Sequence, residues 1–145
     1  MPEVTVTPYN FGADVPNDPV NIPAKAIALV YQTVRDDNIF DNIYHGTLLT
    51  RIIKPGLEVL TQEALRDVLA QWAANSELNL VKFHRLATSY PGDDTTVCVK
   101  ADAVTDVRRI PEGVYEKGYN TLIVLGGIRI VVTEELAAVK AALGH

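Results

Sequence analysis

The hydrophobic positions in the first half of the chain recur at helical spacing. Residues 24–34 form one such stretch, introduced by Pro23, which suits the first turn of a helix. A second stretch, from Leu57 to about Ala74, carries the widest apolar stripe in the chain. Its apolar positions are Leu57, Leu60, Ala64, Leu65, Val68, Leu69 and Trp72. This stripe predicts one long, buried helix that follows a shorter one.

The rest of the chain alternates with the period of a β-sheet. Val4–Thr7 is a short strand candidate, and residues 78–90, 95–104 and 115–132 are longer ones. Gly126-Gly127 lies inside the last of these segments and indicates a bulge, a bend or a tight turn between two strands. Strands in direct succession favour an antiparallel sheet.

A short helix is predicted to close the pattern. Thr133 is the expected N-cap, acidic residues follow it, Lys140 lies near the end and Gly144 terminates the helix. Neither an internal repeat nor a second domain is visible in this order of elements. A long apolar helix followed by strands therefore predicts a single α+β domain over residues 1–145, with an antiparallel sheet curved around the helix.

Composition and charge narrow the class of protein. The formal net charge is -5, which argues against nucleic-acid binding because phosphate contacts need clustered Lys and Arg. The longest apolar run, residues 122–132, contains Arg129 and is too short to cross a bilayer. The first residues lack the pattern of a signal peptide, and the single Cys98 excludes an internal disulfide. These features predict a cytoplasmic protein that does not enter membranes.

Several short motifs follow one another along the chain in an order that can be compared with known families. The chain opens with Phe11-Gly12-Ala13-Asp14-Val15-Pro16, and Pro55-Gly56-Leu57 introduces the long apolar stretch. Phe83-His84-Arg85-Leu86, Tyr90-Pro91-Gly92-Asp93 and Thr95-Thr96-Val97 then follow one another across a predicted turn. Together these motifs resemble the MaoC-like hydratases and dehydratases over nearly the whole chain. The resemblance implies a hot-dog fold, in which an antiparallel sheet wraps around a long central helix.

The family's catalytic motif, D-x-N-P-x-H, is incomplete in this chain. Residues 36–41 read DDNIFD, so Asp36 and Asn38 match the motif while Asp41 stands in the place of its histidine. A second register ends at His45 but has Phe40 at the aspartate position. The resemblance therefore implies Asp36, Asn38, Asp41 and His45 as candidate catalytic residues.

The chemistry implied by the resemblance is hydration or dehydration of an acyl thioester. The substrate would be an α,β-unsaturated or 3-hydroxyacyl thioester of coenzyme A or acyl carrier protein, or a related polyketide-like molecule, and the chain would act by acid/base catalysis. Repulsion between Asp36 and Asp41 in one pocket would raise the pKa of one carboxyl, which could then serve as the acid. The Gly56 N–H, at the start of the central helix, would stabilise the thioester oxygen, or Gly56 is simply a turn glycine before that helix. Leu57 and Tyr44 would line the acyl pocket.

The incomplete motif leaves two other functions open. One is a catalytically silent hot-dog subunit that pairs with an active partner. The other is a cyclase or isomerase that uses the acidic loop as its acid/base group. Acyl length, carrier and reaction direction stay open for each enzymatic alternative.

The sequence predicts neither a cofactor nor a bound metal. It has no dinucleotide-binding or P-loop motif, and no spacing of His, Cys and Asp typical of a metal site. His84 is expected to be structural, and Cys98 a small buried hydrophobe. The long apolar strand through residues 122–132 predicts a homodimer or a hot-dog heterodimer, because pairing edge to edge would cover it.

Overall fold

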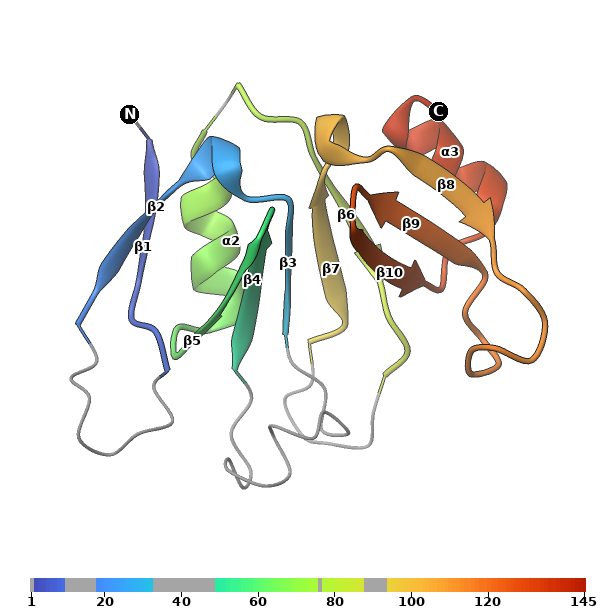
Figure 1. The fold of residues 1–145 in the computed structure, drawn as a ribbon, viewed down its shortest axis with the longest axis horizontal. Helices are drawn as coiled ribbons and strands as arrows, with labels where there is room; N and C mark the ends of the chain where they lie inside the picture. The colour runs from blue at the N-terminus through green and yellow to red at the C-terminus, as the bar shows by residue number, and fades with distance from the viewer. Residues whose placement is uncertain (1, 10–17, 33–48, 76, 88–93) are drawn as a thin grey trace.

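The computed structural model describes residues 2–9, 18–32, 49–75, 77–87 and 94–145 (Figure 1). The strands are β1 Glu3–Val6, β2 Val20–Pro23, β3 Leu29–Gln32, β4 Thr50–Lys54, β5 Leu57–Thr61, β6 Leu80–His84, β7 Thr96–Lys100, β8 Asp106–Arg109, β9 Thr121–Leu125 and β10 Ile128–Val132. The helices are α2 Leu65–Ala73 and α3 Leu136–Leu143, with short 3-10 helices η1 Ala24–Ala26 and η2 Ala101–Ala103. The fold is thus mixed α+β, and every strand pair is antiparallel.

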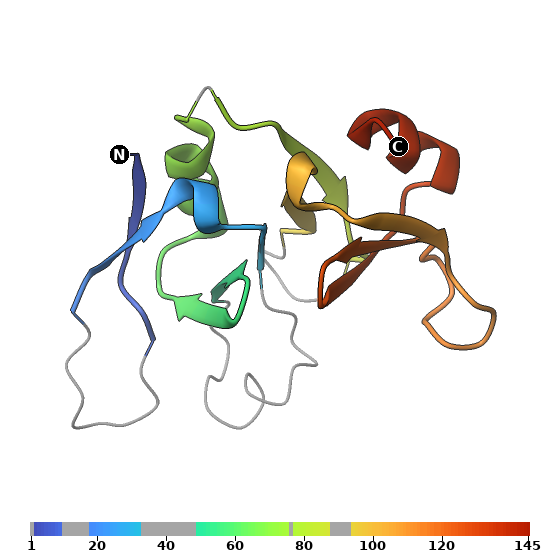
Figure 2. The same cartoon turned by 45° about the horizontal axis from the view of Figure 1, so that its top comes forward.

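The described strands form three sheets. Their orders are β1-β2, β5-β4-β3-β7-β6 and β10-β9-β8. The five-stranded sheet lies in the middle of the molecule, with the other two sheets on either side (Figures 1 and 2). None of the described helices is long and apolar enough to cross a bilayer.

The order of elements occurs twice. The series β1-β2-η1-β3-β4-β5-α2 is followed by β6-β7-η2-β8-β9-β10-α3. We call residues 2–74 the first unit and residues 79–145 the second unit. Residues 20–32 align with 97–109 without a gap, and residues 50–73 align with 121–144 in the same way. Identical aligned pairs include Val20/Val97, Ala24/Ala101, Ala26/Ala103, Val30/Val107, Thr50/Thr121, Ile52/Ile123, Gly56/Gly127, Glu63/Glu134, Leu65/Leu136, Val68/Val139 and Ala70/Ala141.

Equivalent hydrogen bonds confirm the repeat. The Thr50 hydroxyl donates to the backbone oxygen of Glu63, and the Thr121 hydroxyl donates to that of Glu134, both over 2.7 Å. The expectation of no internal repeat is therefore wrong. The repeat is hard to see in the sequence because the connection between β3 and β4 is longer than that between β8 and β9, which interrupts the alignment.

Each unit has its own hydrophobic core, yet the cores exchange strands. The first core lies around α2 and includes Cys98, which comes from β7 of the second unit. The second core lies around α3 and includes Leu29 from β3 of the first unit. This exchange follows from the β3–β7 pairing, because each of these strands presents one face to each core. The pairing of β3 with β7 is therefore the junction between the units.

The predicted long helix from Leu57 is wrong over its first part. Residues 57–61 form β5, which pairs with β4 around the Pro55-Gly56 turn, and the helix begins only at Leu65. Leu57 is 52% exposed, whereas Val68 is fully buried in the first core. The apolar residues of β5 and those of α2 happen to continue one helical spacing, so in the sequence they looked like the stripe of a single helix. The helix packs against β1 and β3.

The predicted helix after Pro23 is also wrong. Only residues 24–26 are helical, as a single 3-10 turn, and the chain continues as β3. Ile27 to Val30 are all buried, because β3 is a central strand covered on both faces. A strand buried on both faces shows a continuous apolar run, which lacks the alternation that identifies a half-buried strand.

Other predicted elements are confirmed. Val4 and Val6 are buried on β1, and Gly126-Gly127 is the tight turn between β9 and β10. Gly144 ends α3 in the left-handed conformation, at φ 73°. The predicted N-cap is wrong, because Glu135 precedes the helix and the Thr133 hydroxyl instead donates to a backbone oxygen of β6.

Candidate functional site

Most of the site residues predicted from the sequence lie outside the described part of the chain. These residues are Asp36, Asn38, Asp41, Tyr44 and His45. Their roles stay predictions.

Gly56 and Leu57 are described, and their setting differs from the prediction. Gly56 occupies the β4–β5 turn with φ 79°, and the next α-helix begins at Leu65. The Gly56 N–H is therefore not at a helix start, so the expected helix setting is wrong, while a substrate-binding role of Gly56 and Leu57 stays a prediction. Leu57 lines a groove on the surface of the first unit instead.

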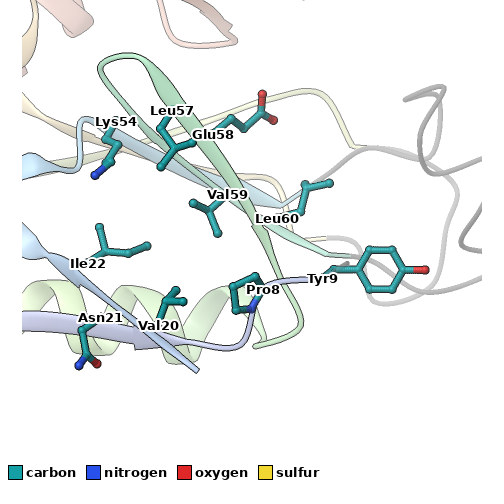
Figure 3. A pocket seen from close by; sticks show the side chains of 10 residues that line it. All are labelled: Pro8, Tyr9, Val20, Asn21, Ile22, Lys54, Leu57, Glu58, Val59 and Leu60. Carbon is teal, nitrogen blue, oxygen red and sulfur yellow. The ribbon is translucent and has the colours of Figure 1, made fainter. Parts of the chain in front are cut away.

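This groove is a concave, largely apolar feature of the described first unit (Figure 3). It has a volume of about 560 Å³. One wall is β2 and the other is the β4–β5 hairpin, while Pro8 and Tyr9 lie at one end. The lining residues are Pro8, Tyr9, Val20, Asn21, Ile22, Lys54, Leu57, Glu58, Val59 and Leu60. Because most of these side chains are apolar, the groove suits another protein surface better than a charged small molecule.

Lys54 and Glu58 are the charged residues that line the groove. Lys54 lies at the end nearer to Ile22, and Glu58 lies farther along the hairpin (Figure 3). Glu58 forms an ion pair with Arg51, whose side chain also donates to the Tyr31 hydroxyl over 2.9 Å. The two charged side chains thus lie among seven apolar or aromatic residues.

The corresponding surface of the second unit is covered. Val97 aligns with Val20 and is fully buried, whereas Val20 is 39% exposed. Ile128, which aligns with Leu57, packs against the second core together with Tyr31 and other first-unit residues. In the second unit, the surface equivalent to this groove is therefore covered by β3 and β4 of the first unit.

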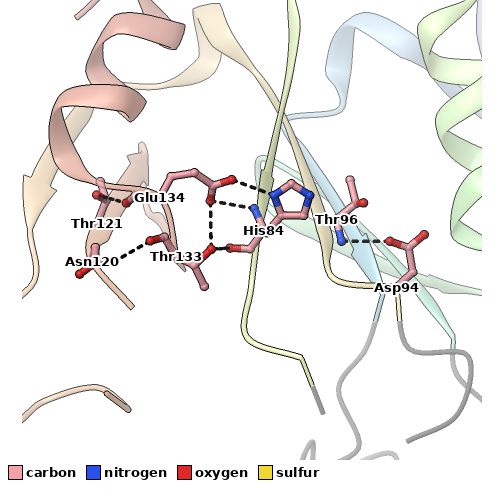
Figure 4. Close-up of polar contacts among 7 residues, drawn as sticks. All are labelled: His84, Asp94, Thr96, Asn120, Thr121, Thr133 and Glu134. Atoms are coloured by element: carbon pink, nitrogen blue, oxygen red, sulfur yellow. Dashed lines mark hydrogen bonds and ion pairs between the residues drawn. The ribbon is translucent and has the colours of Figure 1, made fainter. Parts of the chain in front are cut away.

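A polar cluster at the end of β6 is the other candidate site (Figure 4). One Glu134 carboxylate oxygen lies 2.8 Å from His84 Nδ1, and the other accepts the His84 backbone N–H over 2.9 Å. The Thr133 hydroxyl donates to the His84 backbone oxygen, and the Asn120 side-chain amide donates to the Thr133 backbone oxygen over 2.7 Å. A histidine and a carboxylate in contact could in principle move protons.

The first unit contains the same backbone contact without a histidine. Glu63, which aligns with Glu134, accepts the backbone N–H of Thr7 at 2.6 and 2.9 Å, and Thr7 aligns with His84. The carboxylate therefore ties the first strand of each unit to the segment before its helix, with or without a histidine. The structure agrees with the expected structural role of His84.

Hydrogen bonding keeps both glutamates ionised. Burial alone would raise the pKa of Glu63, but hydrogen bonds from the Thr61 hydroxyl and the Thr7 N–H outweigh burial and lower that pKa. Burial likewise opposes ionisation of Glu134, and the side chain and backbone of His84 reverse the effect, so its pKa is also lowered. A carboxylate with a lowered pKa is a poor proton donor near neutral pH, which again favours a structural role.

The groove was missed from the sequence because neither β2 nor the β4–β5 hairpin was predicted as strands. The available signal was the likeness between residues 20–26 and 97–103, which share valine, alanine and alanine at equal spacing.

Within the described residues, no group of three or more His, Cys, Asp or Glu side chains could hold a metal ion. Comparisons of the chain with models of protein families, with curated proteins and with solved structures find no match.

Proposed function

We propose that this protein is a non-catalytic assembly subunit that associates with further copies of itself through the open surfaces of its two units. The observation that supports this proposal is the junction between the units, which joins two unlike strand edges, β3 and β7. Among the described strands, β8 pairs only with β9 and β2 pairs only with β1. The edges of β8 and β2 that are equivalent to the joined edges of β3 and β7 therefore have no strand partner among the described residues. Each copy thus offers one edge of each kind, together with the apolar groove beside β2.

Exposed apolar surface supports the same proposal. Val20 and Leu57 are 39% and 52% exposed, and they lie on opposite walls of the groove. Contiguous exposed apolar surface beside an unpaired strand edge is typical of an interface between subunits. A second copy is the partner proposed, because the molecule already contains the surface that fills this position in its own second unit.

The thioester hydratase remains a proposal that depends on the family resemblance. Its support is the acidic segment with Asp36, Asn38, Asp41 and His45, which lies outside the described residues. The hot-dog fold, a cytoplasmic location and a thioester carrier, either coenzyme A or acyl carrier protein, are predictions of the same kind. The two alternative functions, a silent subunit of a heterodimer and a cyclase or isomerase, also depend on the resemblance. We favour the assembly subunit because its groove and open edges lie within the described residues.

Sedimentation velocity over a range of concentrations tests the assembly function. We expect the parent chain to self-associate and Val20→Asp to weaken association at least about tenfold, because a buried unpaired charge is costly at an interface. Val114→Asp is the matched control, because Val114 is 63% exposed outside the groove. A parent chain that stays monomeric at every concentration would contradict the assembly function.

Hydration of a panel of short and long enoyl thioesters tests the enzymatic alternative. We expect no turnover above the rate without protein. If the parent chain turns over and Asp36→Asn, Asp41→Asn or His45→Ala lowers the rate by about 10²–10⁴-fold, the chain is an enzyme and the non-catalytic function is wrong.

A further inference from the structure

We infer that β8 of one copy pairs with β2 of the next copy, head to tail, in the register that joins the two units within the chain. This inference rests on the proposed assembly function and specifies its geometry. The open edge of β2 and the open edge of β8 lie on opposite sides of the molecule (Figures 1 and 2). One copy therefore cannot satisfy both edges by itself.

The β3–β7 junction is the template for this contact. Its register pairs Leu29 with Val99, Val30 with Cys98 and Tyr31 with Val97. The sequence alignment of the units transfers each position to β8 and to β2. The resulting pairs are Asp106 with Ile22, Val107 with Asn21 and Arg108 with Val20 of the next copy.

The groove receives the side chains of β8 in this register. Within the chain, Leu29 and Tyr31 of β3 pack against the second core. Asp106 and Arg108 align with these two residues and would enter the equivalent space, which is the groove beside β2. The aliphatic stem of Arg108 would cover Val20, the exposed groove residue opposite it in the pairing.

Charges on the two surfaces match in this register. Asp106, which forms an ion pair with Arg108 within the chain, would lie opposite Ile22 and approach Lys54 at the same end of the groove (Figure 3). Within the chain, the residues aligned with Asp106 and Lys54 are Leu29 and Leu125, both in the second core. Both sides have thus changed from apolar to charged, with opposite signs. Such complementarity favours pairing between copies and selects its register.

Two prolines limit the backbone hydrogen bonds that the edge of β2 can make. In the junction, Lys100 N–H donates to the Ala28 oxygen over 2.9 Å, and by strand alternation the residues two and four positions earlier also face β3. The aligned positions on β2 are Pro23, Asn21 and Pro19, so Asn21 carries the single N–H available on this part of the edge. Longer strand pairing along this edge is disfavoured for the same reason.

The Val107–Asn21 pair keeps both backbone hydrogen bonds in the proposed contact. In the single chain, the Val107 N–H instead donates to Asp106 Oδ1 over 2.8 Å, so it is satisfied before assembly. The contact lacks the bond that Lys100 makes, because Pro23 has no N–H. Since the two edges are unlike, repeated contacts produce a closed ring or an open filament rather than a two-fold dimer.

Disulfide trapping between separately purified variants tests the geometry. Val20→Cys and Arg108→Cys are both at exposed positions, and their pair is a non-hydrogen-bonded one, with a Cα separation of about 4.5 Å that suits a disulfide. We expect a covalent dimer when the two variants are mixed under mild oxidation and none when either is oxidised alone. Cys98 is buried and remains as in the parent chain.

Arg129→Cys is the matched control for a different geometry. Arg129 is exposed in the middle of β10, so an edge-to-edge dimer through residues 122–132 with its two-fold axis near residue 129 would crosslink this variant to itself. We expect no such product. Self-association of the parent without the mixed disulfide would overturn the head-to-tail inference and leave the assembly function standing, whereas a monomeric parent would overturn both.

Charge reversal gives a second, independent test. Lys54→Glu should weaken self-association by about tenfold, because it places two carboxylates together, and a mixture with Asp106→Lys chains should recover mixed assembly. Each variant is first checked for an unchanged circular dichroism spectrum and melting temperature. Equal association of the parent and Lys54→Glu would contradict the inference.

Discussion

Glu63 and Glu134 show how one residue can stabilise the same position in two different surroundings. Each carboxylate accepts the backbone N–H at the end of the first strand of its unit, at Thr7 or at His84. The segment before each helix is thereby held to a strand far away in the sequence. Hydrogen bonding of the ionised form makes this stabilisation depend on pH.

Stability should fall in acid because the pKa values of both glutamates are lowered in the folded chain. Their contribution is fully present above the unfolded pKa, which is 4.5 here, and disappears as pH falls through the lower folded value. We expect the melting temperature to drop between about pH 5 and pH 3. The Glu63→Gln/Glu134→Gln variant should melt lower at pH 7 and show a shallower slope below pH 5. An identical slope in parent and variant would contradict this assignment.

Cys98 should be chemically inert in the folded chain. Burial raises the pKa of its thiol to about 11, against a weaker opposing effect of Lys82. We expect negligible reaction with a thiol reagent at pH 8 in native buffer and one thiol per chain in guanidinium chloride. Rapid stoichiometric reaction of the native protein would show that the β3–β7 junction is open.

At the scale of elements, the sequence predicted the ends of the chain better than its middle. Strand β1 and the β9–β10 turn were predictable from local signals, namely alternation in Val4–Thr7 and two adjacent glycines. Strand β3 was not, because burial on both faces removes alternation. The junction partner of β3 is distant in sequence, so local pattern could not reveal that burial.

Substitutions at Val68 and Leu57 should separate the true helix from the merged stripe. Val68→Asp places an unpaired charge in the first core and should cost more than about 4 kcal/mol of the free energy of unfolding. Leu57→Asp, at a half-exposed position of β5, should change that free energy by less than about 1 kcal/mol. Urea unfolding measures both. Equal, large losses would support a continuous buried helix from Leu57.

At the scale of the whole molecule, the repeat explains both the fold and the open surfaces. Two units share the central sheet through unlike edges, and the same two edges recur at β2 and β8. The aligned identical residues in the printed sequence were sufficient to detect the repeat. The groove was beyond sequence reasoning, because it is defined by what covers Val97 and leaves Val20 exposed.

Hydrogen exchange of backbone amides at low and high protein concentration tests most directly whether the open edges are the contacts between copies. We expect peptides that contain β2 and β8 to gain protection together as concentration rises, while β10 exchanges at an unchanged rate. Protection of β10 alone, or exchange at β2 and β8 that does not depend on concentration, would contradict assembly through these edges.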